Sequence, residues 1–233
     1  ILTGYGAYGN SRTPRFSASI LAWLERGGIF AYAHVRGGGE KGRDWHRAGQ
    51  GKNKMNGVMD LIACAEYLVR NGFTSNRKLA VRGGSMGGIL VGRAYTERPD
   101  LFGAATILVG LVNPLRYLQA GNGANQKAEF DALPDNQAGF ETLMSIDPYH
   151  HLRQGISYPP ALLIVGLNDQ RVAPWMSAKF VARLLALGAD PSHVLLRTDE
   201  DEGHSRGATK NQELLKLADE WAFYLHELRK PAQ

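Results

Sequence analysis

The chain has 233 residues, of which 44% are hydrophobic and 21% charged, and this composition suits one globular domain with a full-sized core. The net charge of +5 comes from scattered lysines and arginines without a basic block, so nucleic-acid binding is not expected. A single cysteine, Cys64, excludes an intrachain disulfide and a cysteine-based metal site. No apolar run approaches the roughly 20 residues of a membrane span, so no membrane partner is expected either.

Short apolar runs alternate with helical patterns along most of the chain. In chain order we predict a strand at residues 1–3, a helix from Pro14 that ends before Gly27, a strand at 29–35 and a helix at 55–70. Next come a strand at 79–82, a helix at 86–97, strands at 104–109 and 161–165, a helix at 175–187, a strand at 194–197 and a helix at 212–228. The repeated strand–helix–strand unit predicts an α/β fold, with a mostly parallel sheet and helices on both faces.

Residues 111–159 interrupt this alternation. The stretch is longer and more polar than the other connections, and it contains several glycines and prolines. A long irregular segment inside a compact domain is usually functional or disordered. We therefore interpret it as a cap or as a wall of a substrate pocket.

The chain begins at Ile1 without a methionine, in a pattern typical of the middle of a strand. We therefore expect a segment upstream of it. No signal peptide is visible, and together with the single cysteine this favours a cytoplasmic location.

A G-x-S-x-G motif occupies residues 83–87, between a predicted strand and a predicted helix. This is the arrangement of a nucleophile elbow, in which a tight turn exposes a serine hydroxyl above the sheet. Gly83 and Gly87 suit such a turn because neighbouring backbone lies too close for a side chain. Ser85 is therefore the predicted nucleophile.

Two glycine motifs, at residues 4–9 and 37–42, match the G-x-G-x-x-G pattern of dinucleotide-binding sites. In those sites the helix begins within the motif, so that its N-terminus meets the pyrophosphate. Here residues 10–13 separate the first motif from Pro14, and a polar loop through residues 44–46 follows the second. We therefore predict no cofactor, and no metal, because no histidine–carboxylate cluster has ligand spacing.

A serine nucleophile needs a general base and an acid that orients the base. In folds with this elbow the chain order is serine, acid, histidine. Of the seven histidines, only His193, His204 and His226 follow the plausible position of the acid. His226 lies inside the last predicted helix, and His193 enters the last strand at the edge opposite to Ser85. His204 follows that strand at the same edge as Ser85, so we predict that it is the base.

Asp169 directly follows the strand at residues 161–165, where the orienting acid should lie. Asp147 and Asp190 lie in turn contexts that suit simple turn chemistry better. Four acidic residues near His204 are alternatives to Asp169: Asp199, Glu200, Asp201 and Glu202.

The tetrahedral intermediate needs hydrogen-bond donors directed at its oxygen. One predicted donor is the backbone N–H of Met86, the residue after the nucleophile. The second should come from the loop after the first strand, residues 4–9, where Tyr5 and Tyr8 carry hydroxyl groups. The alternative for these tyrosines is a packing role beside a glycine-rich turn.

Five ordered stretches of the chain resemble the catalytic domain of the prolyl oligopeptidase family of serine peptidases: GYGAYG, VRGGGEKGRDWHRAG, GGSMGG, NDQRVAP and GHSRG. The resemblance implies an α/β-hydrolase fold with Ser85 as nucleophile, Asp169 as orienting acid and His204 as general base. It also implies that Tyr5 is the side-chain oxyanion donor, and that Arg171 anchors a substrate carbonyl.

The resemblance covers essentially all of residues 1–233, which we interpret as one catalytic domain. Family members usually carry an N-terminal β-propeller, and neither this propeller nor the first strands of the hydrolase sheet are expected within the chain.

Prolyl-specific members have a tryptophan in the stretch equivalent to residues 111–159, which contains none here. The resemblance therefore does not by itself imply proline specificity, and Glu129 or Asp131 could favour a basic residue instead. The residues expected to contact substrate are Tyr8, Arg171, Trp175 and Phe130, with Phe140 or Tyr117 as alternatives to Phe130.

Three functions are compatible with these residues. The leading hypothesis is a serine peptidase that cleaves short peptides through an acyl-enzyme on Ser85. The alternative is a carboxylesterase that uses the same residues on small acyl esters. A non-catalytic binding module on a hydrolase scaffold is the third, because a fold does not determine function.

Overall fold

The structure is a computed structural model, and it describes residues 1–204 and 209–229. Its centre is a six-stranded sheet in the order β2-β1-β3-β4-β5-β6, in which every neighbouring pair is parallel. The strands are β1 (Leu2–Thr3), β2 (Ala31–Tyr32), β3 (Ala80–Gly84), β4 (Ala104–Leu108), β5 (Ala161–Gly166) and β6 (Val194–Asp199). The predicted α/β class with a parallel sheet is confirmed.

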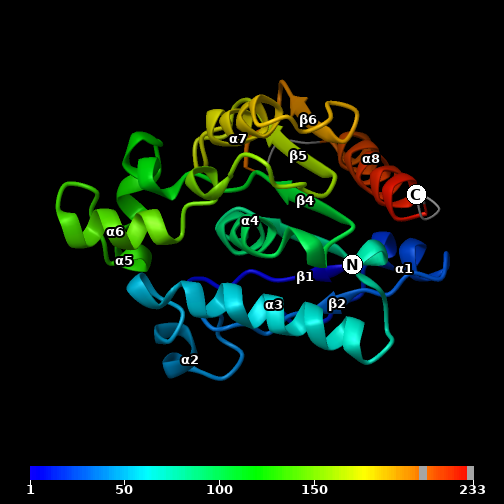
Figure 1. Ribbon diagram of the computed structural model, residues 1–233, viewed down its shortest axis with the longest axis horizontal. Coiled ribbons are helices and arrows are strands. Elements are labelled where there is room, and N and C mark those ends of the chain that lie inside the picture. Colours follow the sequence, from blue (N-terminus) through cyan, green and yellow to red (C-terminus); the bar gives the residue numbers. More distant parts are fainter. Residues whose placement is uncertain (205–208, 230–233) are drawn as a thin grey trace.

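Helices cover both faces of this sheet (Figure 1). The helices of the described residues are α1 (Ala18–Leu24), α2 (Arg43–Arg47), α3 (Met55–Arg70), α4 (Gly87–Glu97), α5 (Lys127–Phe130), α6 (Gln137–Ser145), α7 (Trp175–Ala186) and α8 (Lys210–Leu228). Helices α3, α4 and α7 contribute to the larger hydrophobic core on one face. Helices α1 and α8 contribute Trp23, Phe223 and Tyr224 to a smaller core on the other face.

The strands supply these two cores alternately, as the period of two in a β-strand requires. In β3, Val81 belongs to the larger core and Ala80 to the smaller one. All six residues of β5 are buried, because this strand lies inside the sheet and is covered by helices on both faces.

Several boundaries differ from the prediction. The strand expected at residues 29–35 is reduced to the two paired residues of β2. Helix α1 begins at Ala18 and not at Pro14, because the Ser17 side chain caps it by accepting from the amide of Ile20. The polar loop expected through residues 44–46 forms the short helix α2.

Helix α8 begins two residues earlier than expected because Thr209 and Gln212 form a capping box at its start. A second interaction ties α8 to the sheet. Arg82 of β3 donates two hydrogen bonds to the carboxylate of Glu220, at 2.7 Å and 3.0 Å, and Glu220 is fully buried. This ion pair ties α8 to β3, the strand that leads to Ser85.

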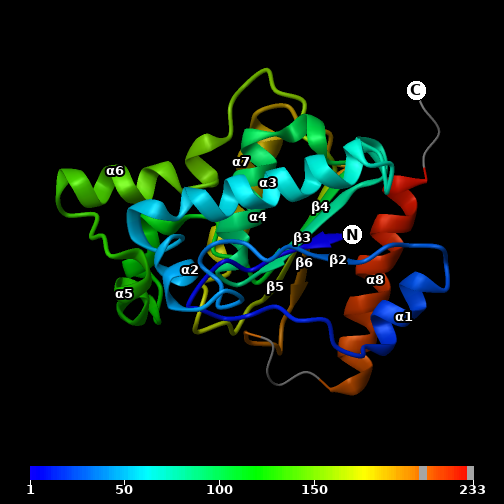
Figure 2. The ribbon, with the colours of Figure 1, turned by 90° about the horizontal axis from the view of Figure 1, so that it is seen from below.

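Residues 111–159 contain helices α5 and α6 with several short 3-10 turns. Figures 1 and 2 both place α5 and α6 at the end of the molecule away from α8. Asp147 joins the two ends of this stretch, because its buried carboxylate accepts from the Asn113 side chain at 2.7 Å and from the Leu115 amide at 3.0 Å. Among the helices of the described ranges, none has the length and apolar character needed to cross a bilayer.

Candidate active site

Ser85 lies in the sharp turn between β3 and α4. Its φ angle of 53° is in the left-handed region, which is strained for a residue with a side chain. The turn is held because the Ser85 amide donates to the Leu108 carbonyl at 2.9 Å. A Cβ atom on Gly83 would lie 2.6 Å from the carbonyl oxygen of Gly87, so this position accepts only glycine.

The structure brings Ser85, His204 and Asp169 together in one chain of hydrogen bonds. The Ser85 hydroxyl lies 2.8 Å from Nε2 of His204, and Nδ1 of His204 lies 2.7 Å from Oδ2 of Asp169. The side chains of His204 and Asp169 are 9% and 1% exposed, so little water competes for these bonds. The three residues come from loops at the carboxyl ends of β3, β5 and β6, which meet at one edge of a parallel sheet.

The loop after β5 orients the carboxylate of Asp169. Its Oδ1 atom accepts from the amides of Arg171 and Val172, at 2.8 Å and 2.9 Å. The second oxygen is thereby directed at His204. Two of the alternative acids serve other partners, since Asp199 pairs with Arg197 and Glu202 pairs with Lys216.

The remaining candidate histidines lie away from Ser85. His193 pairs with the buried Glu227 through Nδ1 at 3.0 Å, and the side chain of His226 is 70% exposed on α8. The GHSRG stretch that contains His204 continues through residues 205–207, which lie outside the described residues.

The two predicted oxyanion donors are the Met86 amide, which follows Ser85 in the chain, and the Tyr5 phenol. Met86 begins the turn into α4, and its amide donates to no protein acceptor among residues 1–204 and 209–229. The phenol of Tyr5 interacts with the Ser85 side chain. Burial raises the pKa of Tyr5, while the Arg12 guanidinium, 4.4 Å from the centre of its ring, opposes this rise. The phenol therefore keeps its proton at neutral pH and can donate it in a hydrogen bond.

Three of the residues predicted to contact substrate, Arg171, Tyr8 and Trp175, lie in or directly after loops at the carboxyl ends of the strands. Arg171 is exposed, and its charge is close enough to Tyr5 and Tyr8 to oppose the rise in pKa that burial causes in both phenols. Tyr8 is 40% exposed, and burial of its phenol raises its pKa. Trp175 begins α7 and packs partly buried against the larger core.

Phe130 does not line an open surface. Its ring has no exposed area and packs against the equally buried Tyr117, with 4.8 Å between the ring centres. Glu129 is also buried, and it pairs with Lys54 instead of presenting a charge to a substrate. Phe130 and Glu129 were expected at the pocket wall because they lie in the polar segment 111–159. This segment has no periodic pattern of apolar residues that would distinguish its buried side chains from its exposed ones.

A substitution at Phe130 tests this placement. Phe130→Ala is expected to lower the free energy of unfolding by about 3–5 kcal/mol, because it removes a large side chain from a closed core. Phe140→Ala, at a position 41% exposed, is the matched control and should cost much less. Urea denaturation of both variants measures the difference, and equal small losses would contradict the core position of Phe130.

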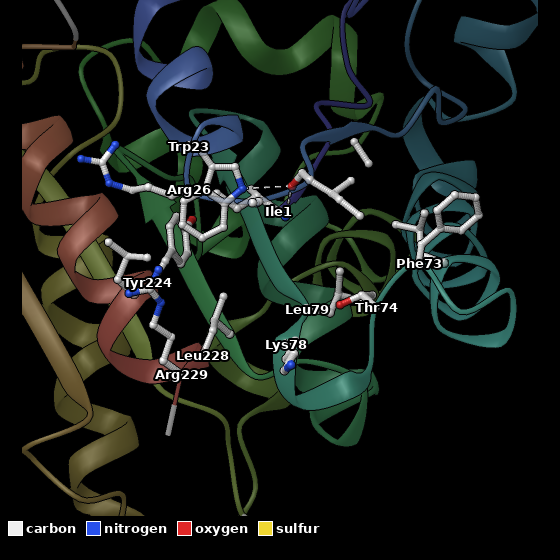
Figure 3. A pocket seen from close by; sticks show the side chains of 16 residues that line it. Ile1, Trp23, Arg26, Phe73, Thr74, Lys78, Leu79, Tyr224, Leu228 and Arg229 are labelled. Carbon is white, nitrogen blue, oxygen red and sulfur yellow. Dashed lines mark hydrogen bonds between the residues drawn. The ribbon is translucent and has the colours of Figure 1, made fainter. Parts of the chain in front are cut away.

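Two of the cavities formed by the described residues lie at opposite ends of the strands. A cavity of about 360 Å³ is lined by Ser85 and His204, together with Tyr32 and Trp221. A second cavity of about 400 Å³ is lined by Trp23, Leu79 and Tyr224, at the amino ends of the strands (Figure 3). Only the first one adjoins the Ser85 hydroxyl.

The sequence interpretation missed a polar network beside the Tyr5 loop. It consists of His46, Lys54 and Glu129, which come from α2, from the turn before α3 and from α5. The only available signal was the stretch VRGGGEKGRDWHRAG, which includes His46. No group of three or more potential metal ligands occurs in the part of the chain that the structure describes.

Comparison with known proteins finds one family model, described as the prolyl oligopeptidase family, which matches residues 14–231. The chain is 40% identical to a prolyl endopeptidase of Elizabethkingia miricola over 228 residues, which is 98% of the chain and 32% of the relative. It is 35% identical to Protease 2 of Moraxella lacunata over 235 residues, covering 100% of the chain and 34% of that protein.

Solved structures agree with these sequence comparisons. A prolyl endopeptidase superposes with a TM-score of 0.94 at 38% identity, over 97% of this chain and 33% of that one. Oligopeptidase B of Trypanosoma brucei with covalently bound antipain superposes with a TM-score of 0.92 at 36% identity, over 100% of this chain and 33% of that one. The chain thus spans about a third of the length of the relatives it matches.

Proposed function

The chain belongs to the prolyl oligopeptidase family, and on that premise we propose that it carries the catalytic centre of a serine peptidase that cleaves short peptides through an acyl-enzyme on Ser85. The observation that carries the proposal is the hydrogen-bond chain from Ser85 through His204 to Asp169. The order of these residues in the sequence, serine then aspartate then histidine, and their position at the carboxyl ends of the strands support the same assignment.

The proton positions follow from the chemistry of the three groups. A carboxylate only accepts hydrogen bonds, so Nδ1 of His204 carries the proton that is donated to Asp169. Nε2 is then unprotonated and accepts from the Ser85 hydroxyl at 2.8 Å. This is the tautomer that a general base needs.

The reaction begins when Oγ of Ser85 attacks the scissile carbonyl and Nε2 of His204 takes its proton. The buried carboxylate of Asp169 stabilises the imidazolium that forms. The carbonyl oxygen becomes an oxyanion, which the Met86 amide and the Tyr5 phenol stabilise by donating hydrogen bonds. His204 then protonates the leaving amine, and the acyl group remains on Ser85.

Water completes the cycle. His204 removes a proton from a water molecule that attacks the acyl-enzyme, and the proton returns to Ser85 when the carboxylic acid leaves. The exposed guanidinium of Arg171, near Tyr5 and Tyr8, can hold a carbonyl oxygen of the bound peptide by donating to it.

Comparing amide and ester substrates tests the peptidase proposal. We expect turnover of peptide amides with proline, arginine or alanine before the scissile bond to exceed the background of a Ser85→Ala variant. Labelling of Ser85 by a fluorophosphonate is expected in the same preparation. Ester turnover with no amide turnover above background would favour the carboxylesterase, and absence of labelling would favour a binding module.

The role of Tyr5 leads to a second expected result. Tyr5→Phe should lower kcat about 10²- to 10³-fold, because one oxyanion donor is lost while the ring and its packing are kept. KM should change little, since the phenol interacts mainly with the charged intermediate. Tyr67→Phe, at an exposed position of α3, is the control. A kcat within twofold of the wild type in both variants would remove Tyr5 from the oxyanion site.

A further inference from the structure

A buried cluster of charged side chains lies beside the loop that carries Tyr5. Glu129 of α5 is 2% exposed, and its Oε1 atom lies 2.6 Å from the ammonium of Lys54, which is 4% exposed. Its Oε2 atom lies 2.9 Å from Nε2 of His46 in α2, where α2 and α5 approach each other (Figure 2). The cluster therefore connects three segments that are far apart in the sequence.

The same carboxylate also binds the backbone of the Tyr5 loop. Oε2 of Glu129 accepts from the amide of Tyr8 at 3.1 Å. Tyr8 has a φ angle of 56°, which is strained for a residue with a side chain and must be held by surrounding contacts. The backbone of the next residue, Gly9, lies against the His46 ring and donates to the Gly37 carbonyl at 3.1 Å.

Burial makes this arrangement sensitive to the loss of any one partner. Desolvation lowers the pKa of Lys54, and the neighbouring Glu129 opposes this by favouring the charged ammonium. A buried carboxylate with three donors is satisfied, whereas removal of its charge leaves a buried ammonium without a counterion. None of these three side chains touches Ser85, His204 or Asp169 through a hydrogen bond in the described structure.

We propose that Glu129 is a positioning residue that holds the Tyr8 amide, and through residues 4–9 places the Tyr5 phenol at the oxyanion site; this rests on the proposed function of Ser85. The path is short, because Tyr5 and Tyr8 lie three residues apart and their rings are 6.4 Å apart. The charge of Glu129 also acts on both phenols, whose pKa values it raises. Glu129 thus favours the protonated, donating form of Tyr5.

A double-mutant cycle tests this role. Glu129→Gln removes the charge and replaces one carboxylate oxygen by an amide N–H₂. The Lys54 ammonium favours the amide oxygen at the Oε1 position, so the N–H₂ faces the Tyr8 amide and His46, and both lose the acceptor they share. We expect kcat to fall about 10- to 100-fold with KM within about twofold, because misplacing one group in a catalytic site has effects of this size. In a Tyr5→Phe background the same substitution should change kcat less than about twofold, because the phenol that it misplaces is already absent.

Two variants separate positioning from loss of fold. Glu129→Gln combined with Lys54→Met removes the uncompensated ammonium, so the folded state should be retained while the Tyr8 amide still loses its charged acceptor. Glu141→Gln, on the exposed face of α6, is the matched control and should leave kcat and stability unchanged. Hydrogen exchange of the peptide that contains Tyr8, measured by mass spectrometry on the intact protein, should accelerate in both Glu129 variants and not in the control.

The outcomes are distinguishable. Equal kcat losses from Glu129→Gln in the wild-type and Tyr5→Phe backgrounds would overturn the positioning role, as would unchanged exchange of the Tyr8 peptide. Absence of any Ser85-dependent turnover in the wild type would overturn the proposed function instead. The exchange measurement does not depend on turnover, so it still decides whether Glu129 orders the loop.

Discussion

Ser85→Ala is expected to lower kcat by about 10⁵- to 10⁶-fold on the best peptide amide. The hydroxyl is the atom that forms the acyl-enzyme, and neither His204 nor the oxyanion donors can replace it as a nucleophile. The residual rate should come from substrate binding and the oxyanion donors alone. The free energy of unfolding should change little, because alanine removes no packing and keeps the Cβ atom, so the strain of the backbone at φ of 53° is the same in both proteins.

Steady-state kinetics and fluorophosphonate labelling together measure this effect. Ser157→Ala, at an exposed loop position, is the matched control and should retain wild-type kinetics and labelling. Labelling should be lost only in the Ser85 variant. A Ser85→Ala protein that keeps more than a hundredth of the wild-type rate would contradict an acyl-enzyme on this residue.

Asp169→Asn is the second large effect, with an expected loss of about 10⁴-fold in kcat at neutral pH. The asparagine oxygen can still accept from the amides of Arg171 and Val172, which lie 2.8 Å and 2.9 Å from Oδ1 of the aspartate. Its N–H₂ group then faces Nδ1 of His204 and stabilises the tautomer that has its proton on Nε2. That tautomer cannot accept the Ser85 proton.

The loop should keep its fold in this variant, so the loss reflects chemistry rather than unfolding. Kinetics together with thermal unfolding separate the two, and Asp135→Asn at an exposed position is the control. A kcat loss below about tenfold in a folded Asp169→Asn protein would show that another acid orients His204. Glu200 and Asp201, in the turn before His204, would then be examined in the same way.

The fold and the meeting of Ser85, His204 and Asp169 could be predicted from the sequence for a clear physical reason. Buried parallel strands are short apolar runs, and the helices between them show a period of 3.6, so the alternation is visible locally. Parallel strands bring all their carboxyl ends to one edge of the sheet. Loops after separate strands therefore converge, and chain order together with position directly after a strand was enough to associate Ser85 with Asp169 and His204. In the structure His204 lies 2.8 Å from the Ser85 hydroxyl and 2.7 Å from the Asp169 carboxylate.

Within residues 111–159, the sequence did not predict which side chains are buried. Phe130 and Glu129 lie in a short helix of four residues, where no periodic pattern distinguishes a buried side chain from an exposed one. The sequence suggested a pocket wall for both. In the structure Phe130 packs on Tyr117, and Glu129 pairs with Lys54, 75 positions away in the chain.

The sequence by itself determined the parallel α/β architecture, the serine elbow and the three residues that meet at it, because each depends on local patterns and on strand direction. Only the tertiary structure decided what holds the Tyr5 loop in place. The Tyr8 amide, His46 and Lys54 meet Glu129 across three separate segments. A carboxylate surrounded by such donors is stable when buried, but the pairing exists only after the chain has folded.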